Sequence, residues 1–407
     1  MNCNCTAVAL KGESMNTVPS SERIHIGFFG MRNAGKSSLV NAVTGQKLSL
    51  VSDIRGTTTD PVKKAMELLP LGPVVIIDTP GLDDEGELGQ MRVRRAKDML
   101  SSVHIAVLVV DALKGMSDED KSLAAEIESR KIPLIIAMNK ADLLEDVPEN
   151  ESNKVYVSAE KSIGITELKN KLTSLGKTAK NDKKILADLV SKGDTVLLVT
   201  PIDESAPKGR LILPQQQTIR ELLEIGCVTL VVQVSEITQA LSNLKTAPKL
   251  VITDSQAFSQ VSQLVPPDIK LTSFSILFAR YKGDLDTVAK GAHKLSALSD
   301  GDRILISEGC THHRQCKDIG TVKLPGWIKK FSGKDLQFDF TSGGTFPDDL
   351  SEYALVIHCG GCTLNENEMK NRLARCESQG VAVTNYGTAI AEMNGILRRS
   401  LEVFEIK

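Results

Sequence analysis

Gly30-Met-Arg-Asn-Ala-Gly-Lys-Ser37 is the stretch that decides the fold of the amino-terminal part of the chain. It fits the phosphate-binding pattern G-x-x-x-x-G-K-[ST], in which glycines let backbone N–H groups point at phosphate oxygens. The apolar run Ile24–Phe29 precedes it as a predicted strand, and Lys36–Val43 follows it as a predicted helix. Lys36 can reach the β- and γ-phosphates, and the Ser37 hydroxyl can bind Mg²⁺. A strand, loop and helix in this order predict a nucleotide-binding P-loop, not a chance glycine-rich turn.

Strands and helices alternate from residue 21 to residue 176, which is typical of a doubly wound, mostly parallel α/β sheet. In such a sheet, ligands lie beyond the carboxyl ends of the strands. We therefore predict one domain over residues 21–176, preceded by a disordered polar leader, 1–20, that holds Cys3 and Cys5. The predicted strands are Ile24–Phe29, Val74–Ile77, Val103–Val110, Pro133–Met138 and Val155–Val157, and the helices include Met91–Leu100 and Asp118–Arg130.

Two polar motifs suit Mg²⁺ and the γ-phosphate. Asp78-Thr-Pro-Gly81 follows a predicted strand, so Asp78 is placed to hold Mg²⁺ and the Gly81 N–H to sense the γ-phosphate. Thr58 lies in a polar stretch where a mobile switch loop belongs, and a threonine there can complete the Mg²⁺ shell. Leu82 stands where Ras-like proteins carry the water-positioning glutamine, so we expect slow unaided hydrolysis.

Two further motifs suit a guanine base. In Asn139-Lys140-Ala-Asp142, the Asp142 carboxylate can accept hydrogen bonds from guanine N1–H and its amine, which adenine does not match. Ser158-Ala159 follows another strand and can cap the base edge. The order of the motifs predicts a GTPase with Lys36, Asn33, Thr58 and Gly81 as catalytic candidates. The candidate nucleotide-binding residues are Gly30, Asn33, Ala34, Gly35, Lys36, Ser37, Ser38, Thr58, Asp78, Gly81, Asn139, Lys140, Asp142, Ser158 and Ala159.

Asn33, in the middle of the P-loop, has two interpretations. It resembles the loop asparagine of potassium-activated GTPases of the TrmE-like class, in which a bound K⁺ occupies the place of an arginine finger. It equally suits a turn that asparagine favours for conformational reasons. The sequence leaves both open.

Composition limits the remaining functions. The chain has 407 residues, which predicts two or three domains, and its net charge of −2 with no long charge run argues against a general nucleic-acid or membrane binder. Its apolar runs are too short to span a bilayer, and it begins without the apolar core of a signal peptide. We expect a cytoplasmic protein, in which eight cysteines favour metal or redox use over disulfides.

Residues 185–267 form a second predicted α/β segment that carries no catalytic motif. A lysine-rich linker at 177–184 precedes it, and Pro266-Pro267 marks its end. Its apolar strand Val228–Val234 offers a sheet edge for pairing, so an interaction module is favoured over a catalytic one. Cys227 is expected to be a core thiol because apolar residues flank it.

Residues 268–407 carry two groups of cysteine and histidine, each just beyond a predicted strand. Cys310-Thr-His312-His313 follows Arg303–Ser307, and His358-Cys359-Gly-Gly-Cys362 follows Tyr353–Ile357. The Cys-x-x-Cys spacing lets two thiolates bind one cluster or metal ion, and its glycines offer N–H donors to sulfur. A helix predicted over Leu364–Arg375 would stabilise these thiolates through its dipole.

Other residues near these groups have less certain roles. His358 is either a ligand or a residue that shapes the surroundings of the ligands. Cys316 is either a ligand or a helix-face thiol, and Cys376, in a polar helical stretch, is expected to be incidental. Cys3 and Cys5 are either an auxiliary metal pair or two thiols without a role, and the second interpretation is favoured.

The whole pattern is specific: a GTPase with Asn33 in its loop, then Cys310-x-His312, 45 residues, and His358-Cys359-x-x-Cys362. It resembles the HydF family of [FeFe]-hydrogenase maturation GTPases over nearly all of residues 21–407. The resemblance implies that Cys310, Cys359 and Cys362 hold a [4Fe–4S] cluster with an exchangeable fourth site. His312 and His358 match the motif and are further candidate ligands.

The same resemblance implies a fold and a set of partners. The implied fold is an α/β GTPase domain at 21–176, a small α/β dimerisation domain at 185–267 and an α/β cluster-binding domain at 268–407. The protein would be a homodimeric scaffold without nucleic-acid or membrane partners. It would accept a two-iron precursor from two radical-SAM maturases and pass it to the apo-hydrogenase, using GTP, Mg²⁺ and K⁺.

Two alternatives remain open at this stage. A TrmE-like GTPase of tRNA modification or ribosome assembly explains residues 21–176 equally well but leaves the cysteine motifs unexplained. A structural zinc site is the second alternative, since three cysteines and one histidine suit zinc.

Overall fold

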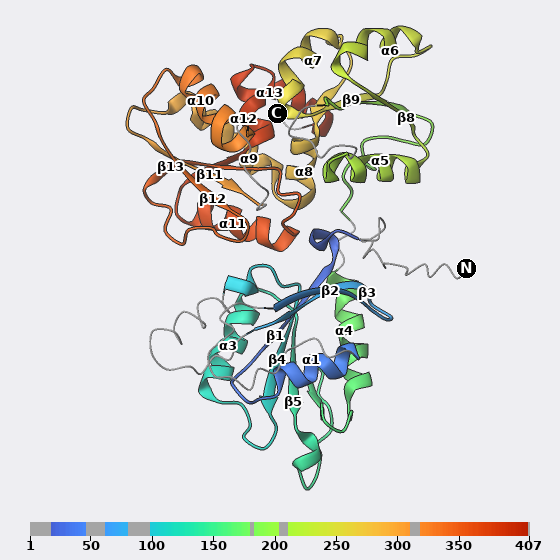
Figure 1. Ribbon diagram of the computed structural model, residues 1–407, viewed down its shortest axis with the longest axis vertical. Coiled ribbons are helices and arrows are strands. Elements are labelled where there is room, and N and C mark those ends of the chain that lie inside the picture. The colour runs from blue at the N-terminus through green and yellow to red at the C-terminus, as the bar shows by residue number, and fades with distance from the viewer. Residues whose placement is uncertain are drawn as a thin grey trace, which may run out of the picture. The chain divides into compact units, whose positions relative to one another are not determined.

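The computed structural model describes residues 18–45, 62–79, 98–179, 183–202, 211–309 and 318–405 (Figure 1). The chain divides into two compact units. The first comprises the described residues of Met1–Ala96 and His104–Ala179, and the second those of Lys97–Val103 and Lys180–Lys407. Six strands form one sheet in the first unit, and eight strands form two sheets in the second.

The sheet of the first unit has the strand order β2-β3-β1-β4-β5-β6. Its neighbouring strands are parallel except β2 and β3, which pair antiparallel. The sequence did not predict β2, whose lysines and glutamate suit an edge strand and give no apolar run. The strands are β1 (Ile24–Phe29), β2 (Val62–Leu68), β3 (Gly72–Asp78), β4 (Ile105–Asp111), β5 (Leu134–Asn139) and β6 (Lys154–Tyr156).

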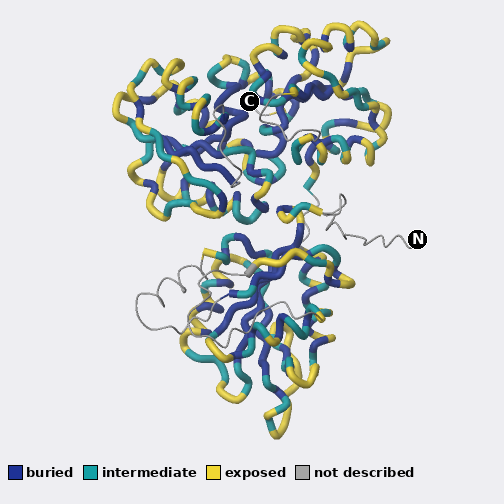
Figure 2. The backbone as a smooth tube through the Cα atoms, viewed as in Figure 1, coloured by how far each residue is buried: buried dark blue, intermediate teal, exposed yellow. Residues whose placement is uncertain are grey.

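Helices cover this sheet and bury its central strands. Every residue of β1 is buried, as are the first six residues of β4, and the tube in Figure 2 is dark blue along these strands. Continuous apolar runs of this kind are what a sheet covered on both faces requires, so the predicted doubly wound fold is confirmed. The predicted helix Met91–Leu100 lies largely outside the described residues. The described helices are α1 (Lys36–Thr44), α3 (Asp118–Ser129) and α4 (Ile165–Ala179).

The second unit contains two four-stranded sheets, ordered β10-β9-β7-β8 and β12-β11-β13-β14. All their strand pairs are parallel. The strands are β7 (Thr195–Val199), β8 (Val228–Val232), β9 (Leu250–Thr253), β10 (Leu271–Ser273), β11 (Arg303–Glu308), β12 (Gln337–Ser342), β13 (Tyr353–His358) and β14 (Ala382–Asn385). The helices are α5 (Leu213–Ile225), α6 (Ile237–Asn243), α7 (Phe258–Leu264), α8 (Phe274–Lys282), α9 (Leu285–Ala292), α10 (Leu324–Ser332), α11 (Glu366–Ser378), α12 (Tyr386–Met393) and α13 (Leu397–Leu401).

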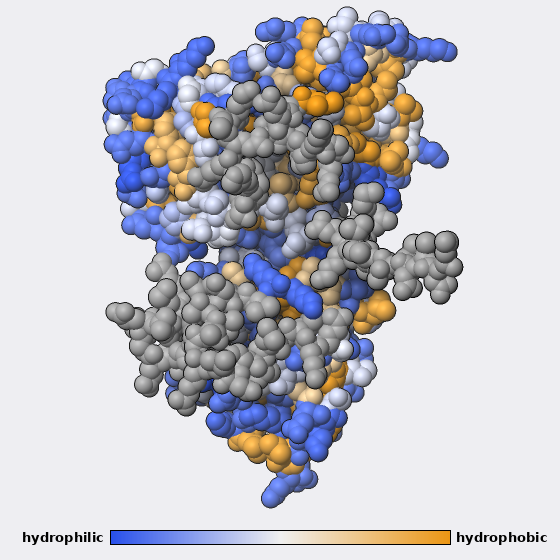
Figure 3. Space-filling view, in the orientation of Figure 1, coloured by the Kyte–Doolittle hydropathy of each residue, from blue (hydrophilic) through white to orange (hydrophobic). Residues whose placement is uncertain are grey.

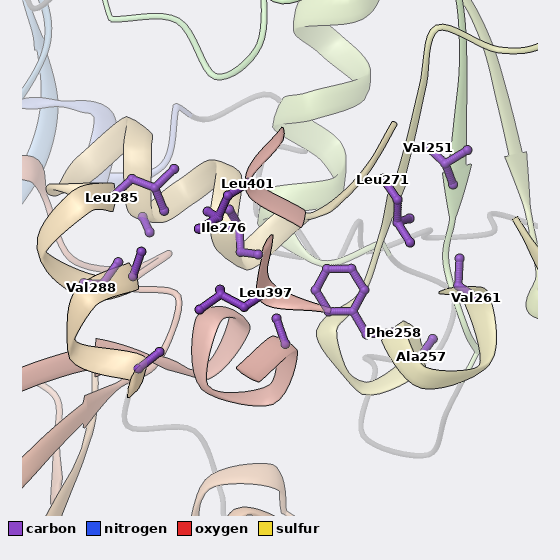
Figure 4. Packing of buried hydrophobic residues seen from close by; sticks show 14 of the residues in the cluster. Val251, Ala257, Phe258, Val261, Leu271, Ile276, Leu285, Val288, Leu397 and Leu401 are labelled. Carbon is purple, nitrogen blue, oxygen red and sulfur yellow. The ribbon is translucent and has the colours of Figure 1, made fainter. Parts of the chain in front are cut away.

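One hydrophobic core joins the two sheets of the second unit. Val251 on β9 and Leu271 on β10 belong to the same buried cluster as Leu285 on α9 and Leu397 on α13. Figure 4 shows Phe258 between Leu397 on one side and Leu271 on the other, with Val251 beyond Leu271 and Leu285 beyond Leu397. Helix α8 takes part in this cluster and in a second buried cluster beside β7. Residues 185–267 therefore share a core with the segment that follows them.

Strand β8 forms an edge of its sheet and leaves apolar side chains exposed. Val228 is 54% exposed and Val231 is 46% exposed. Figure 3 shows hydrophobic side chains on the visible face of this part of the second unit. An apolar edge strand of this kind is suited to pairing with another chain. Among the described residues, no helix is both long and apolar enough to cross a membrane.

Candidate functional site

The P-loop has the backbone that its glycines make possible. Gly35 has φ +88°, and a Cβ there would lie 2.2 Å from the Asn139 side-chain nitrogen. Gly30 has φ +139°, and a Cβ there would lie 2.2 Å from the Val109 carbonyl oxygen. Only glycine fits both positions, since other residues rarely adopt such φ values and would collide. Asn33 also has a positive φ, of 61°, and is exposed, as is Ser38.

The predicted Mg²⁺ ligands meet at the carboxyl end of β3. The Ser37 hydroxyl, on the first turn of α1, donates a hydrogen bond of 2.8 Å to the Asp78 carboxylate. The Lys36 ammonium donates to the carbonyl oxygens of Gly30 and Met31, both at 2.8 Å. These contacts hold the Lys36 side chain along the loop into which phosphates would bind.

The Asp78 carboxylate has an oxygen that suits a metal ion. Its Oδ1 is buried and has no hydrogen-bond partner among the described residues. Burial raises the pKa of Asp78, and the Ser37 hydrogen bond and the Lys36 charge oppose that rise. A buried, unpaired carboxylate oxygen is costly in the absence of a cation. The residues present therefore fit Mg²⁺.

The guanine motifs also come together. The Asn139 amide donates to the Ala34 carbonyl oxygen at 2.9 Å, and its Oδ1 accepts from the Ala159 N–H at 3.1 Å. Asn139 thus connects the P-loop with the Ser158-Ala159 loop. Lys140 has φ +65° and donates to Asp111 at 2.6 Å. Asp142 lies two residues after Lys140, in the short 3-10 helix Ala141–Leu143, and is partly exposed.

Two predicted nucleotide-site residues, Thr58 and Gly81, lie outside the described residues, as does Leu82, which stands where Ras-like proteins carry glutamine. The P-loop, the aspartate that ends β3 and the two guanine motifs are all present at the carboxyl edge of one sheet. This is where ligands of doubly wound folds bind.

The Cys359–Cys362 loop follows β13 at the carboxyl edge of the third sheet. The Cys359 thiol accepts hydrogen bonds from the N–H groups of Gly309 at 3.0 Å and Gly361 at 3.4 Å. The Thr363 hydroxyl donates to the Gly309 carbonyl oxygen at 2.7 Å. The loop after β13 is thus bonded to Gly309, which directly follows β11 and precedes Cys310 in the sequence.

Burial is the main influence on the pKa values of the two thiols of this loop. It raises the pKa of Cys359, and the N–H groups of Gly309 and Gly361 oppose the rise. It also raises the pKa of Cys362, and the Lys282 charge opposes the rise. The helix predicted over Leu364–Arg375 is α11, which begins two residues later, at Glu366. The predicted glycine donor to sulfur is also present, since the Gly361 N–H donates to Cys359, and the Gly309 N–H is a second donor. Thiols with such donors fit a metal or cluster, which binds thiolates.

His358 is fully buried and lies against α11. Its Nε2 is 3.4 Å from an Arg372 nitrogen, and its ring stacks on Phe346 with centroids 5.8 Å apart. Burial, assisted by the Arg372 charge, lowers the pKa of His358 well below its usual value. Its Nδ1 has no hydrogen-bond partner within the described part of the chain. The contacts place His358 in the packing beneath the cysteine loop.

The sequence missed a buried lysine beside this loop. Lys282, the last residue of α8, is 3% exposed. Its ammonium donates to the carbonyl oxygens of Gly361 at 3.2 Å, Cys362 at 2.9 Å and Leu364 at 2.9 Å. No local pattern identifies such a residue, because its partners lie about eighty positions away in the sequence.

A second buried polar contact lies at the same strand edge. The Tyr386 hydroxyl donates to the Glu308 carboxylate at 3.2 Å, and burial raises the pKa of Tyr386. A Cβ at Gly320 would meet both side chains, at 2.1 Å and 2.5 Å. Glu308 is the last residue of β11. The next residue, Gly309, donates to the Cys359 sulfur, so the Tyr386–Glu308 contact lies one residue from the cysteine loop's partner.

The remaining cysteines and histidines fall into two groups. Cys3, Cys5, Cys310, His312, His313 and Cys316 lie outside the described residues. Among the residues that the structure describes, no three His, Cys, Asp or Glu side chains gather as a metal site. Cys227 is buried and donates to the Ser191 carbonyl oxygen at 3.3 Å, as expected of a core thiol.

Cys376 is not an incidental thiol of a polar helix. It is fully buried in the shared core of the second unit, and burial raises its pKa to about 12. It follows Met369 and Leu373 on the buried face of α11. These three residues are spaced four and three positions apart, which places them on one face of a helix and indicates a core position. The polar residues between them made the segment read as an exposed helix.

Comparisons with known proteins identify three regions. Residues 25–140 match the family model described as 50S ribosome-binding GTPase. Residues 185–283 match the hydrogen maturase F dimerization domain, and residues 286–403 match the hydrogen maturase F tetramerization domain. The first match contains the P-loop and the Asn139-Lys140 pair, and the last contains both cysteine groups.

Curated relatives resemble the amino-terminal part. The GTPase Der of Kosmotoga olearia is 34% identical over 182 residues, which cover 40% of this chain and 41% of that protein. The tRNA modification GTPase MnmE of Francisella tularensis is 33% identical over 183 residues, which cover 43% of this chain and 40% of that protein. The match thus spans about two fifths of each relative's length. A solved structure of Era from Aquifex aeolicus is 19% identical, and the match covers 59% of this chain and 97% of that chain with a TM-score of 0.34.

Proposed function

Because the chain belongs to the hydrogen maturase F family, we propose that it is a GTP-hydrolysing scaffold and carrier in [FeFe]-hydrogenase maturation. The observation that carries the proposal is that two domain models of this family together match more than half of the chain. The GTPase match supports the hydrolytic part. The Cys359–Cys362 loop at a strand edge supports the part that concerns a metal cofactor.

The nucleotide site would bind Mg²⁺·GTP and hydrolyse it slowly. Ser37 and Asp78 would hold Mg²⁺, which neutralises charge on the phosphates, and Lys36 would contact the β- and γ-phosphates. Asn139 and Asp142 would bind guanine, with the Ser158-Ala159 loop at the base edge. Thr58 would complete the Mg²⁺ shell when the γ-phosphate is present, and the Gly81 N–H would sense the γ-phosphate.

Potassium would assist this hydrolysis through Asn33. The support is the position of an exposed side chain on a left-handed backbone in the middle of the P-loop. A cation there would supply charge that an arginine finger supplies in other GTPases. The left-handed φ of 61° is also what a turn-forming asparagine adopts, so the ion dependence must be measured directly.

The cysteine loop would hold a [4Fe–4S] cluster together with Cys310. Two thiols from one loop and the N–H groups of Gly309 and Gly361 support this assignment. When bound, the cluster would supply one iron without a cysteine ligand, at which another iron unit could be exchanged. His312 and His358 remain candidate ligands of that iron, although the buried contacts of His358 with Arg372 and Phe346 favour a packing role.

The cargo would be a two-iron precursor, accepted from two radical-SAM maturases and passed to an apo-hydrogenase in the cytoplasm. Dimerisation and tetramerisation models imply self-association, and we propose that the basic unit is a homodimer. The exposed edge strand β8 supports pairing through residues 185–267. The domain boundaries at 21–176, 185–267 and 268–407 remain part of this proposal.

The alternative is a TrmE-like GTPase of tRNA modification or ribosome assembly with a structural zinc site. Similarity to the tRNA modification GTPase supports it, but that similarity covers 43% of the chain. In this alternative, the cysteine loop has no part in the activity of the GTPase.

Metal content of the full-length protein separates the two functions. The protein is purified without oxygen, and iron, acid-labile sulfide and zinc are measured before and after reconstitution with iron and sulfide. We expect about four irons and four sulfides per chain, and an EPR signal after reduction. One zinc without iron would contradict the maturation function and support the alternative.

A further inference from the structure

We propose that Lys282 is the positioning residue of the Cys359–Cys362 loop, and that its charge favours the reduced state of the cluster held there. The inference rests on the proposed cluster site and adds a residue that no motif includes. It derives from a convergence of three carbonyl oxygens, those of Gly361, Cys362 and Leu364, on one ammonium.

The geometry of an ammonium suits this arrangement. Lysine has three N–H donors on one nitrogen, and the three loop carbonyls accept at 2.9–3.2 Å. Gly361 is bonded on both sides, since its carbonyl accepts from Lys282 and its N–H donates to the Cys359 sulfur at 3.4 Å. Fixing the Gly361 carbonyl therefore also fixes the donor to a cysteine that would bind iron.

The lysine itself is held in place by its helix. Phe274, Leu277 and Phe278 of α8 are buried in a core with β7 and β9. The Phe278 ring lies 5.8 Å from the Lys282 nitrogen, which adds a cation–π contact. The ammonium therefore reaches the loop from a rigid support, so its position does not depend on the loop.

Lys282 also links two regions that family models treat separately. It lies in the match to the dimerization domain, residues 185–283, whereas the loop lies in the match to the tetramerization domain, residues 286–403. The cysteine loop is thus shaped by a side chain from the dimerisation region. A cluster that gains an electron gains negative charge, which a buried cation nearby stabilises.

The test compares Lys282→Met with Lys290→Met in the full-length protein. Both changes remove one positive charge, but Lys290 is exposed on α9. In cluster-free protein, deuterium uptake of a peptide covering residues 359–366 is measured by mass spectrometry. We expect at least tenfold faster uptake there in Lys282→Met and no change in a peptide covering α3. Wild-type uptake in Lys282→Met would overturn the positioning role.

The second measurement uses reconstituted protein and EPR-monitored redox titration. We expect a shift of the reduction potential to a more negative value in Lys282→Met, faster loss of iron to a chelator, and partial recovery of both in Lys282→Arg. Lys290→Met should match the wild type in both. A wild-type potential in Lys282→Met would overturn the role of the charge.

Two further outcomes keep the inference distinct from other failures. If Lys282→Met does not fold, judged by circular dichroism, Lys282→Gln is measured instead. Its two N–H donors cannot serve all three carbonyl oxygens, so deuterium uptake should still rise, and its lack of charge should still shift the potential; wild-type values would overturn the respective roles. If the wild type binds zinc and no iron, the maturation function fails, while deuterium uptake in the cluster-free protein still decides whether Lys282 positions the loop.

Discussion

The Ser37 hydroxyl donates a hydrogen bond of 2.8 Å to the Asp78 carboxylate, although 41 positions separate the two residues. The contact joins the first turn of α1 to the end of β3. It leaves the second Asp78 oxygen, Oδ1, buried without a hydrogen-bond partner among the described residues. The pair is thus arranged to receive a cation, and its behaviour without one can be tested.

Asp78→Asn should remove Mg²⁺-dependent GTP hydrolysis, by about two orders of magnitude, because the site loses the charge that holds the ion. It should also stabilise the metal-free GTPase unit. Since burial raises the Asp78 pKa, the native state binds more protons than the unfolded state, and wild-type stability falls as pH rises from about 4 through the raised pKa. Calorimetry should show the variant's advantage growing over that range. An advantage that shrinks with rising pH would contradict the assignment.

Gly35→Ala should weaken GTP binding because its Cβ would lie 2.2 Å from the Asn139 side chain. The displaced amide would lose its bond to the Ala34 carbonyl oxygen. Gly45→Ala is the matched control, since Gly45 also has a positive φ but has open space around it. We expect the control to lose about 1–2 kcal/mol of stability and keep its GTP affinity. Equal losses of affinity, measured by titration calorimetry, would count against the Asn139 connection.

Asn33→Gly should abolish any difference between hydrolysis rates in K⁺ and Na⁺. Glycine is a cleaner change than alanine here, because Asn33 has φ +61° and alanine would add backbone strain. The wild type should be faster in K⁺. Equal wild-type rates in the two salts would refute the potassium hypothesis. Lys36→Ala should lose hydrolysis in both salts and retain the cluster, because the two sites lie in separate units.

Val231→Lys should convert a dimer into a monomer in light scattering, because it places a charge on the exposed edge of β8. Val147→Lys is the control, since Val147 is similarly exposed at 52% but lies in the GTPase unit. A dimer that survives Val231→Lys would contradict pairing through this edge. Deleting residues 185–267 is a poor test of dimerisation, because the deletion would also remove part of the core that they share with α9 and α13.

Serine at Cys310, Cys359 or Cys362 should each abolish visible absorption and the EPR signal after reconstitution, because all three thiolates are needed to hold the cluster. Cys316→Ser should leave both largely intact, and imidazole or cyanide should alter the EPR signal of the reduced wild type. Cys376→Ala serves as a control for loss of a buried thiol at a core position. Loss of the cluster in Cys316→Ser would indicate full cysteine ligation and exclude the exchangeable site.

The strands that are buried on both faces of a sheet could be predicted from the sequence. Ile24–Phe29 and Ile105–Asp111 are apolar runs because both faces of the sheet are covered, so their strands could be found without a structure. Edge strands β2 and β12 were missed because water on one side permits polar residues there. Motifs with fixed spacing, such as the P-loop and Cys359-x-x-Cys362, identified site residues for the same local reason.

Residues whose role depends on distant partners could not be predicted. Lys282 is the last residue of an apolar helix, and only folding brings it to the carbonyls of the cysteine loop. Cys376 appeared incidental because its neighbours are polar, yet its face of α11 is buried. The fold was therefore easier to predict than the side chains that support its second site.

The shared core of the second unit has a consequence for how the protein melts. Val251 and Leu271 pack in the same cluster as Leu285 and Leu397, so neither sheet can lose its packing while the other keeps it. In a heating scan, residues 185–405 should absorb heat in a single cooperative transition rather than in one for each family-model region. Unfolding of the sheet of β7–β10 on heating would then also release the iron, even though Cys310, Cys359 and Cys362 lie in a different part of the sequence.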